Sequence, residues 1–127
     1  MFQISVIDDD EHLRNAIKNL VQSLGYCVYT FASAEEFLRS PNANDTSCLI
    51  TDIQMPGMSG VDLQARLTDH GHRASVIFIT AYPDERVQAL ALKAGAVCCL
   101  NKPFDGKALI ECLDEAMRRY SIRTDED

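Results

Sequence analysis

The chain has 127 residues, of which 46% are hydrophobic and 24% are charged, which fits one compact domain able to bury roughly two-thirds of its unfolded surface. Its formal net charge of −7 argues against a nucleic-acid-binding surface, because such surfaces normally carry a basic patch. The chain has no apolar stretch near the roughly 20 residues of a membrane span and no signal sequence before its first apolar run, so we expect a cytoplasmic protein without membrane contact.

Strand-like segments alternate with helix-like segments along the chain. Short apolar runs predict the strands, and apolar residues at spacings of three and four predict the helices. In chain order the predicted segments are a strand at 4–7, a helix at 11–24, a strand at 26–31, a helix at 34–39, a strand at 48–51, a helix from residue 60 towards 71, a strand at 75–79, a helix at 85–94, a strand at 96–100 and a last helix after residue 105. Asp10 has the type of a helix N-cap, Ser33 and Glu36 indicate a capping box, and Gly25 and Gly95 stop the helical patterns before them.

Repeats of strand then helix predict an α/β fold. Right-handed crossovers would place the helices on both faces of one parallel sheet. We predict a flavodoxin-like (βα)5 three-layer sandwich with the strand order 2-1-3-4-5, in which the first and third strands lie side by side. Residues 1–120 are expected to form this single domain, and the polar residues 121–127 a tail or the start of a linker.

Polar side chains follow four of the predicted strands. Asp8 and Asp9 follow the first strand, Asp52 the third, Thr80 the fourth, and Lys102 comes shortly after the fifth. Because the carboxyl ends of parallel strands meet at one edge of an open sheet, these endings should lie together where such sheets bind ligands. Three carboxylates, a hydroxyl and an ammonium group would then share one small cleft.

The crowded carboxylates of this cleft predict a metal ion. Two carboxylates about 4 Å apart repel each other by on the order of 4 kcal/mol at the effective dielectric of a protein surface. Oxygen ligands without His or Cys favour a hard cation, and a site open to water and phosphate suits Mg²⁺. The metal and Lys102 together would bind a phosphoryl group.

Four motifs, in this order, resemble the CheY-like receiver domain of bacterial two-component response regulators. They are Val6–Asp10 (VIDDD), Asp52–Gly60 (DIQMPGMSG), Ile79–Ala81 (ITA) and Lys102–Phe104 (KPF). The resemblance covers roughly residues 3–120. The stretch 71–104 is most similar to the FixJ-type branch, whose members usually join a receiver to a DNA-binding helix-turn-helix domain.

The resemblance implies the chemistry of the carboxylates. Asp52 would be the phosphoacceptor, which takes a phosphoryl group from a sensor histidine kinase and becomes an acyl phosphate. Asp9, Asp52 and the backbone carbonyl of Gln54 would bind Mg²⁺ directly, and Asp8 would act mainly through bound water. The protein would therefore be a signalling phosphoacceptor with self-catalysed phosphotransfer and dephosphorylation, and not an enzyme acting on other substrates.

The resemblance also implies how the signal leaves the site. Lys102 would neutralise phosphoryl charge, and a cis Lys102–Pro103 peptide bond would direct its ammonium group inward. Thr80 would move its hydroxyl to a phosphoryl oxygen and so change the surface of the fourth helix and fifth strand. The implied partners are a DNA-binding output domain or a separate effector, and a second copy of the chain in a phosphorylation-dependent homodimer.

One position departs from the family pattern. Receivers usually carry Tyr or Phe three residues before the lysine, and this chain has Cys99 there, which cannot fill the space of a ring. We hypothesise that Tyr82 substitutes for that ring by packing over the site. Gln54 and Tyr82 are both large and flank the expected path of water to the acyl phosphate, which predicts slow self-dephosphorylation.

Other function classes fit the residues less well. A phosphohydrolase of the haloacid-dehalogenase kind needs a second Asp two residues after its nucleophile, and Gln54 cannot transfer protons there. A flavin or nucleotide binder would need a Gly-rich loop after the first strand. A degenerate receiver acting as a phosphorylation-independent interaction module is the main alternative, because Cys98 and Cys99 weaken the expected output surface.

The five cysteines predict no disulfide and no zinc site. They are odd in number, lack paired metal-ligand spacing and mostly lie in apolar runs, so we expect all of them to be reduced and packed as small hydrophobic side chains. These residues are Cys27, Cys48, Cys98, Cys99 and Cys112. The three histidines match no ligand spacing and are expected to be exposed.

Overall fold

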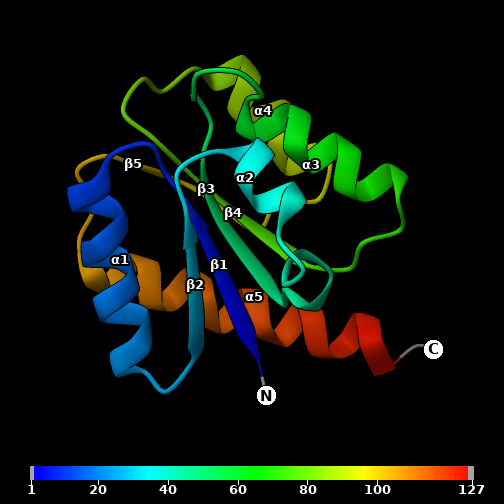
Figure 1. The fold of residues 1–127 in the computed structure, drawn as a ribbon. Coiled ribbons are helices and arrows are strands. Elements are labelled where there is room, and N and C mark those ends of the chain that lie inside the picture. Colours follow the sequence, from blue (N-terminus) through cyan, green and yellow to red (C-terminus); the bar gives the residue numbers. More distant parts are fainter. Residues whose placement is uncertain (1, 126–127) are drawn as a thin grey trace.

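Strands and helices alternate along the chain in a computed structural model, which describes residues 2–125 (Figure 1). The strands are β1 (Gln3–Ile7), β2 (Cys27–Phe31), β3 (Cys48–Asp52), β4 (Ser75–Thr80) and β5 (Cys98–Asn101). The helices are α1 (Glu11–Ser23), α2 (Ala34–Arg39), α3 (Gly60–Asp69), α4 (Glu85–Lys93) and α5 (Gly106–Asp125), with a 3-10 helix, η1 (Ala43–Asp45), between α2 and β3. Each predicted strand and helix is present, with shifts at some ends.

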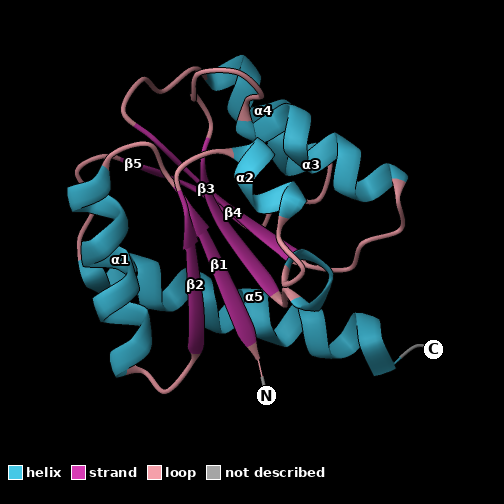
Figure 2. Ribbon diagram, viewed as in Figure 1, coloured by secondary structure: helices cyan, strands magenta, loops and turns pink. Residues whose placement is uncertain are grey.

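The five strands form one parallel sheet in the order β2-β1-β3-β4-β5, as predicted. Figure 2 shows α1 and α5 on one side of this sheet and α2, α3 and α4 on the other. The side chains of each helix layer form a separate hydrophobic core against their own face of the sheet. The three-layer sandwich is therefore confirmed.

The central strands β3 and β4 are buried along their whole length. Their nearly continuous apolar sequences fit this position, because a central parallel strand is covered by helices on both faces. The edge strands β2 and β5 remain partly exposed. Burial of β3 and β4 fixes the two strands whose ends carry Asp52 and Thr80.

Short polar side chains begin four of the helices. Asp10 Oδ1 accepts hydrogen bonds from the backbone N–H groups of the first turn of α1, and Ser33, Ser59 and Asp84 do the same for α2, α3 and α4. Each such cap stabilises a helix by about 1 kcal/mol. The capping box of α2 is shifted by one residue, because the Glu36 carboxylate accepts from the N–H of Ala32.

Strand β5 begins two residues later than predicted. Gly95 has a φ of +110° after α4, and the N–H of Ala96 donates to the carbonyl of Ala91 at 3.0 Å. This pattern is a Schellman motif, which satisfies the last carbonyl groups of the helix. Ala96 therefore belongs to the helix end, although its apolar character suggested a strand.

Helix α5 extends further than predicted and continues through Asp125. The expected tail at 121–127 is thus helical as far as residue 125, and residues 126–127 lie outside the described residues. Glu115 pairs with Arg118 at 2.6 Å and with Arg119 at 2.7 Å, and ion pairs one turn apart stabilise a helix by a few tenths of a kcal/mol each. Between residues 2 and 125, no helix has both the length and the apolar character that crossing a bilayer needs.

The prediction that all cysteines are reduced is wrong for two of them. A disulfide joins Cys98 on β5 to Cys112 on α5, whose Cα atoms lie 6.5 Å apart. Cys48 is buried, whereas Cys27 and Cys99 are half-buried, and these three are free thiols. Spacing along the chain did not reveal the pair, because packing of α5 against the sheet brings the two residues together.

Candidate functional site

The site lies at the carboxyl edge of the sheet, where the strand order reverses between β1 and β3. In the register of these strands Ile7 lies opposite Thr51, so the next residues, Asp8 and Asp52, are neighbours. Thr80 ends β4, and Lys102 follows β5. The sheet therefore brings together all five residues predicted for the cleft, which come from four separate parts of the chain.

The three carboxylates of Asp8, Asp9 and Asp52 form one cluster. Each offers a carboxylate oxygen, and these oxygens lie within 4.8 Å of one another. Asp8 is fully buried and Asp52 is 5% exposed, whereas Asp9 faces solvent. The cluster thus has two inner carboxylates and one at its mouth.

Lys102 balances the inner carboxylates. Its Nζ donates to Asp52 Oδ2 at 2.8 Å and lies 3.1 Å from Asp8 Oδ2. Burial by itself would lower the pKa of Lys102, but hydrogen bonds and the negative charges of Asp52 and Asp8 outweigh it and raise that pKa. Lys102 is therefore an ammonium ion directed into the cluster, and its peptide bond to Pro103 is cis, as the resemblance implied.

Asp8 is a buried carboxylate whose ionised form is disfavoured by its surroundings. Burial raises its pKa, and the negative charge of Asp52 adds to this, while hydrogen bonds from the Asp10 N–H and Lys102 act in the opposite direction. The Oδ2 atom of Asp8 is buried, and among residues 2–125 its one polar partner is the Lys102 ammonium group, at 3.1 Å. Three neighbouring carboxylates that share one ammonium group among the described residues fit a hard divalent cation such as Mg²⁺.

Thr80 and Gln54 connect the ends of β4 and β3. The buried Thr80 hydroxyl donates to Gln54 Oε1 at 2.7 Å and accepts from the backbone N–H of Tyr82 at 3.0 Å. The backbone N–H of Gln54 donates to Asp52 Oδ1 at 3.1 Å. The Tyr82 ring is 74% exposed, so it does not cover the site in this structure.

Gly60 lets α3 begin directly against the end of β3. A Cβ at this position would collide with the backbone oxygen of Asp52 and come within 3.0 Å of the Phe78 ring. The Gly60 N–H donates to the carbonyl of Ile53 at 2.9 Å. The segment that carries Asp52 is thus held by backbone contact with the first turn of a helix.

Two residues that support the site were not found from the sequence. Glu35 on α2 accepts a hydrogen bond from the Met58 N–H at 3.0 Å, and the pKa of its carboxyl is lowered by a hydrogen bond from its own backbone N–H and by the one from Met58. Arg14 on α1 donates to the backbone carbonyl of Asp8 at 2.7 Å. Neither had a sequence signal, because both look like ordinary charged residues on helix surfaces.

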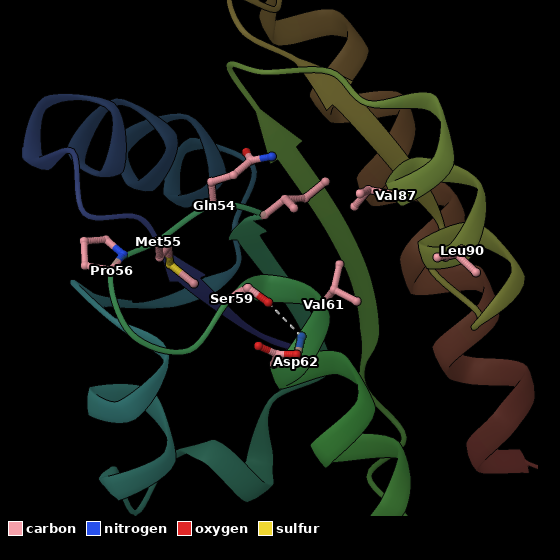
Figure 3. A pocket seen from close by; sticks show the side chains of 9 residues that line it. Gln54, Met55, Pro56, Ser59, Val61, Asp62, Val87 and Leu90 are labelled. Carbon is pink, nitrogen blue, oxygen red and sulfur yellow. Dashed lines mark hydrogen bonds between the residues drawn. The ribbon is translucent and has the colours of Figure 1, made fainter.

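Cys99 lies in the partly exposed strand β5, opposite Phe78 of β4. It packs against the core on the side of α2, α3 and α4, and burial raises the pKa of its thiol. Cys99 thus holds the strand position at which the family pattern has an aromatic residue. An open cavity of about 640 Å³ lies nearby between α3 and α4, with Met55, Val61, Val87 and Leu90 among its lining residues (Figure 3).

A family model described as "Response regulator receiver domain" matches residues 4–114. The chain belongs to this family. The receiver domain is 38% identical over 115 residues to the response regulator protein TodT of Pseudomonas putida, covering 91% of this chain and 51% of that protein. It is 36% identical over 116 residues to the transcriptional regulatory protein FixJ of Azorhizobium caulinodans, covering 91% of this chain and 55% of that protein. The receiver domain thus spans about half the length of the curated relatives it matches.

Solved structures agree with this family. The response regulator StyR superposes with a TM-score of 0.89 and 36% identity, covering 98% of this chain and 63% of that chain. A receiver domain protein from Clostridium thermocellum superposes with a TM-score of 0.88 and 32% identity, covering 96% and 98% of the two chains. The receiver domain therefore has the fold of CheY-like response regulators.

Proposed function

We propose that this receiver domain accepts a phosphoryl group from a sensor histidine kinase on Asp52. The observation that supports this most directly is the position of the Asp52 carboxylate, which Lys102 contacts at 2.8 Å within a cluster of three carboxylates at the switch point of the sheet. Such a carboxylate is held in place by its contacts, as a nucleophile requires.

In the proposed transfer, an oxygen of the Asp52 carboxylate bonds to phosphorus while the phosphorus–nitrogen bond of a kinase phosphohistidine breaks. The imidazole nitrogen keeps the bonding electron pair and takes a proton. The Gln54 N–H and the Lys102 ammonium fix the two oxygens of Asp52 before the reaction. Lys102 then neutralises part of the charge on the arriving phosphoryl oxygens.

The proposed cofactor is Mg²⁺, held by Asp8, Asp9, Asp52 and the backbone carbonyl of Gln54. The fit rests on the three carboxylates, whose oxygens lie within 4.8 Å of one another, and on the buried Asp8 oxygen, whose one polar partner among the described residues is Lys102. When bound, Mg²⁺ supplies positive charge that offsets the charge of carboxylates and phosphoryl oxygens.

The proposed output is a change at the surface of α4 and β5 after Thr80 moves to the phosphoryl group. Relatives named as response regulators and as transcriptional regulatory proteins support an output in gene control. In the cytoplasm the receiver domain would act on a DNA-binding output domain or a separate effector. A phosphorylation-dependent homodimer through the same surface is part of this proposal.

A receiver that binds partners without phosphorylation is the second candidate. The observation that favours it is Cys99, which leaves the position of the usual ring unfilled by an aromatic side chain. The site itself argues for the first candidate, because a domain that no longer used phosphate would have no need to keep two inner carboxylates beside an ammonium group.

Incubation with labelled acetyl phosphate and Mg²⁺ separates the two candidates. The wild-type protein should take up acid-labile phosphate, and Asp52→Asn should take up none. Asp69→Asn removes an exposed carboxylate at the end of α3 and should label like wild type. Absence of labelling in the wild type, or labelling of Asp52→Asn, would overturn the proposed phosphoacceptor and favour the second candidate or another residue.

A further inference from the structure

The Thr80 hydroxyl already donates its single proton in this structure. Its oxygen accepts from the Tyr82 N–H at 3.0 Å, and its single proton is donated to Gln54 Oε1 at 2.7 Å. A hydroxyl has one hydrogen to donate, so donation to Gln54 and donation to any other acceptor exclude each other. Thr80 cannot reach a new acceptor with its proton until the bond to Gln54 is broken.

The two ends of that bond differ in their access to water. Thr80 is fully buried, whereas Gln54 is exposed and its side chain extends toward the ribbon of β4 (Figure 3). Once released, the Gln54 amide can exchange its partner for water at little cost, but a buried hydroxyl without an acceptor is penalised. The bond therefore restrains Thr80 more than it restrains Gln54.

Gln54 also connects the loop after β3 with the loop after β4. Its Nε2 lies 3.5 Å from the Tyr82 carbonyl, which is a long and weak contact, and its backbone N–H holds Asp52 Oδ1 at 3.1 Å. One residue thus contacts the phosphoacceptor, Thr80 and the loop before α4. Its position lets it couple the state of Asp52 to the position of Thr80.

We propose that Gln54 is a positioning residue that holds Thr80 in its unphosphorylated place and so sets how readily the domain switches. The inference rests on the proposed function, because it assumes that a phosphoryl oxygen competes with Gln54 Oε1 for the Thr80 proton. Loss of the Gln54 acceptor removes one competitor and favours the switched state. The net strength of one hydrogen bond makes the expected change in affinity for a phosphoryl mimic roughly two- to tenfold.

This role differs from simple shielding of the site by a bulky side chain. Gln54→Met keeps nearly the length and volume of glutamine but has no amide oxygen, so it preserves shielding and removes the bond to Thr80. Gln54→Ala removes both. Gln54→Glu keeps an acceptor oxygen and should leave Thr80 close to its wild-type position in the free protein.

The test is titration with beryllofluoride and Mg²⁺, followed by calorimetry and by NMR of the Thr80 methyl group and the Tyr82 amide. Gln54→Met and Gln54→Ala should both bind roughly two- to tenfold more tightly than wild type and should shift both resonances before any addition. Gln54→Glu should keep the wild-type resonances in the free protein. Gln22→Met, at an exposed glutamine near the far end of α1, should match wild type throughout.

The outcomes separate this inference from the proposed function. If wild type binds beryllofluoride but Gln54→Met binds with unchanged affinity, the positioning role is overturned and the proposed function stands. A tighter Gln54→Ala with an unchanged Gln54→Met would assign the residue to shielding only, which also overturns the inference. If wild type does not bind at all, the proposed function fails and this inference with it.

Discussion

At the scale of single residues, the site combines buried charged groups, each of which would be unfavourable without an opposite charge beside it. Asp8 is buried with a raised pKa, and only Lys102 and the Asp10 N–H lower that pKa again. Before any cation binds, the folded protein therefore bears an electrostatic cost at this position. Binding of the proposed Mg²⁺ would offset that cost, because a nearby positive charge favours the ionised form of a carboxylate.

Asp8→Asn should stabilise the protein in Mg²⁺-free buffer at neutral pH. Replacing the buried carboxylate by a neutral amide removes its desolvation and its repulsion from Asp52, which we expect to raise the free energy of unfolding by about 1 kcal/mol. Because the folded pKa of Asp8 is raised, ionisation destabilises the folded state above that pKa. The gain should therefore shrink as the pH falls and Asp8 becomes protonated.

Urea unfolding of both proteins between neutral and acidic pH measures this effect. Asp9→Asn is the matched control, because Asp9 is exposed and its removal should change the unfolding free energy less. An Asp8→Asn variant less stable than wild type at neutral pH without Mg²⁺ would contradict this reading of the buried carboxylate.

At the scale of elements, close contacts between helices and strands hold the site residues in place. Gly60 lies where α3 meets the end of β3, and Glu35 of α2 binds the following loop through Met58. The sequence predicted the helix start near Gly60 correctly. It did not predict the Glu35 contact, because α2 and that loop are neighbours only after the sheet has formed.

Gly60→Ala should destabilise the domain by about 1–3 kcal/mol, the usual cost of forcing an extra group into a packed position. The added methyl would meet the backbone oxygen of Asp52, which cannot move away as a flexible side chain could. Gly106→Ala is the control, because its methyl would meet only the Leu20 side chain at 3.4 Å at the first position of α5. Equal unfolding free energies for the two variants would show that the contact with β3 is unimportant.

The disulfide between β5 and α5 gives a second prediction at this scale. Unfolding without reductant should leave Cys27, Cys48 and Cys99 open to alkylation, and mass spectrometry should find the other two cysteines joined. Because this crosslink closes a loop with a sequence separation of 14 residues, reduction should lower the free energy of unfolding by about 3 kcal/mol.

Cys27→Ser is the matched control for the crosslink, since it removes a free thiol and should leave the effect of reductant unchanged. Alkylation of all five cysteines in protein unfolded without reductant would show that the thiols are not joined in solution, in agreement with the sequence-based expectation.

At the scale of the whole molecule, the pattern of strands and helices was enough to predict the sheet order and the residues gathered at its edge. Asp8, Asp52, Thr80 and Lys102 could be placed together because the end of a parallel strand is a position that topology fixes. The bond between Thr80 and Gln54 could not be predicted, because it depends on the rotamer of one exposed side chain. The joining of Cys98 to Cys112 likewise depends on how α5 lies against the edge strand.

Mg²⁺ should stabilise the whole domain, because a ligand that binds only the folded state shifts unfolding by mass action. At a concentration 100 times the dissociation constant, the expected gain in unfolding free energy is about 2.7 kcal/mol. Thermal unfolding with MgCl₂, compared with NaCl of equal ionic strength, measures it. Asp52→Asn should lose most of this gain in stability. A wild-type protein that unfolds at the same temperature with and without Mg²⁺ would argue against the metal site.

The glycine turns at the opposite rim of the sheet have a consequence for engineering. Gly25 and Gly71 connect helices to the following strands there, and each has open space where a side chain would be. Asp8, Asp9, Asp52, Thr80 and Lys102 all lie at the other rim, so insertions or new chain termini at these turns should leave the proposed phosphoryl transfer intact. A reporter peptide could therefore be inserted at residue 71 without contacting the carboxylates or the lysine of the candidate site.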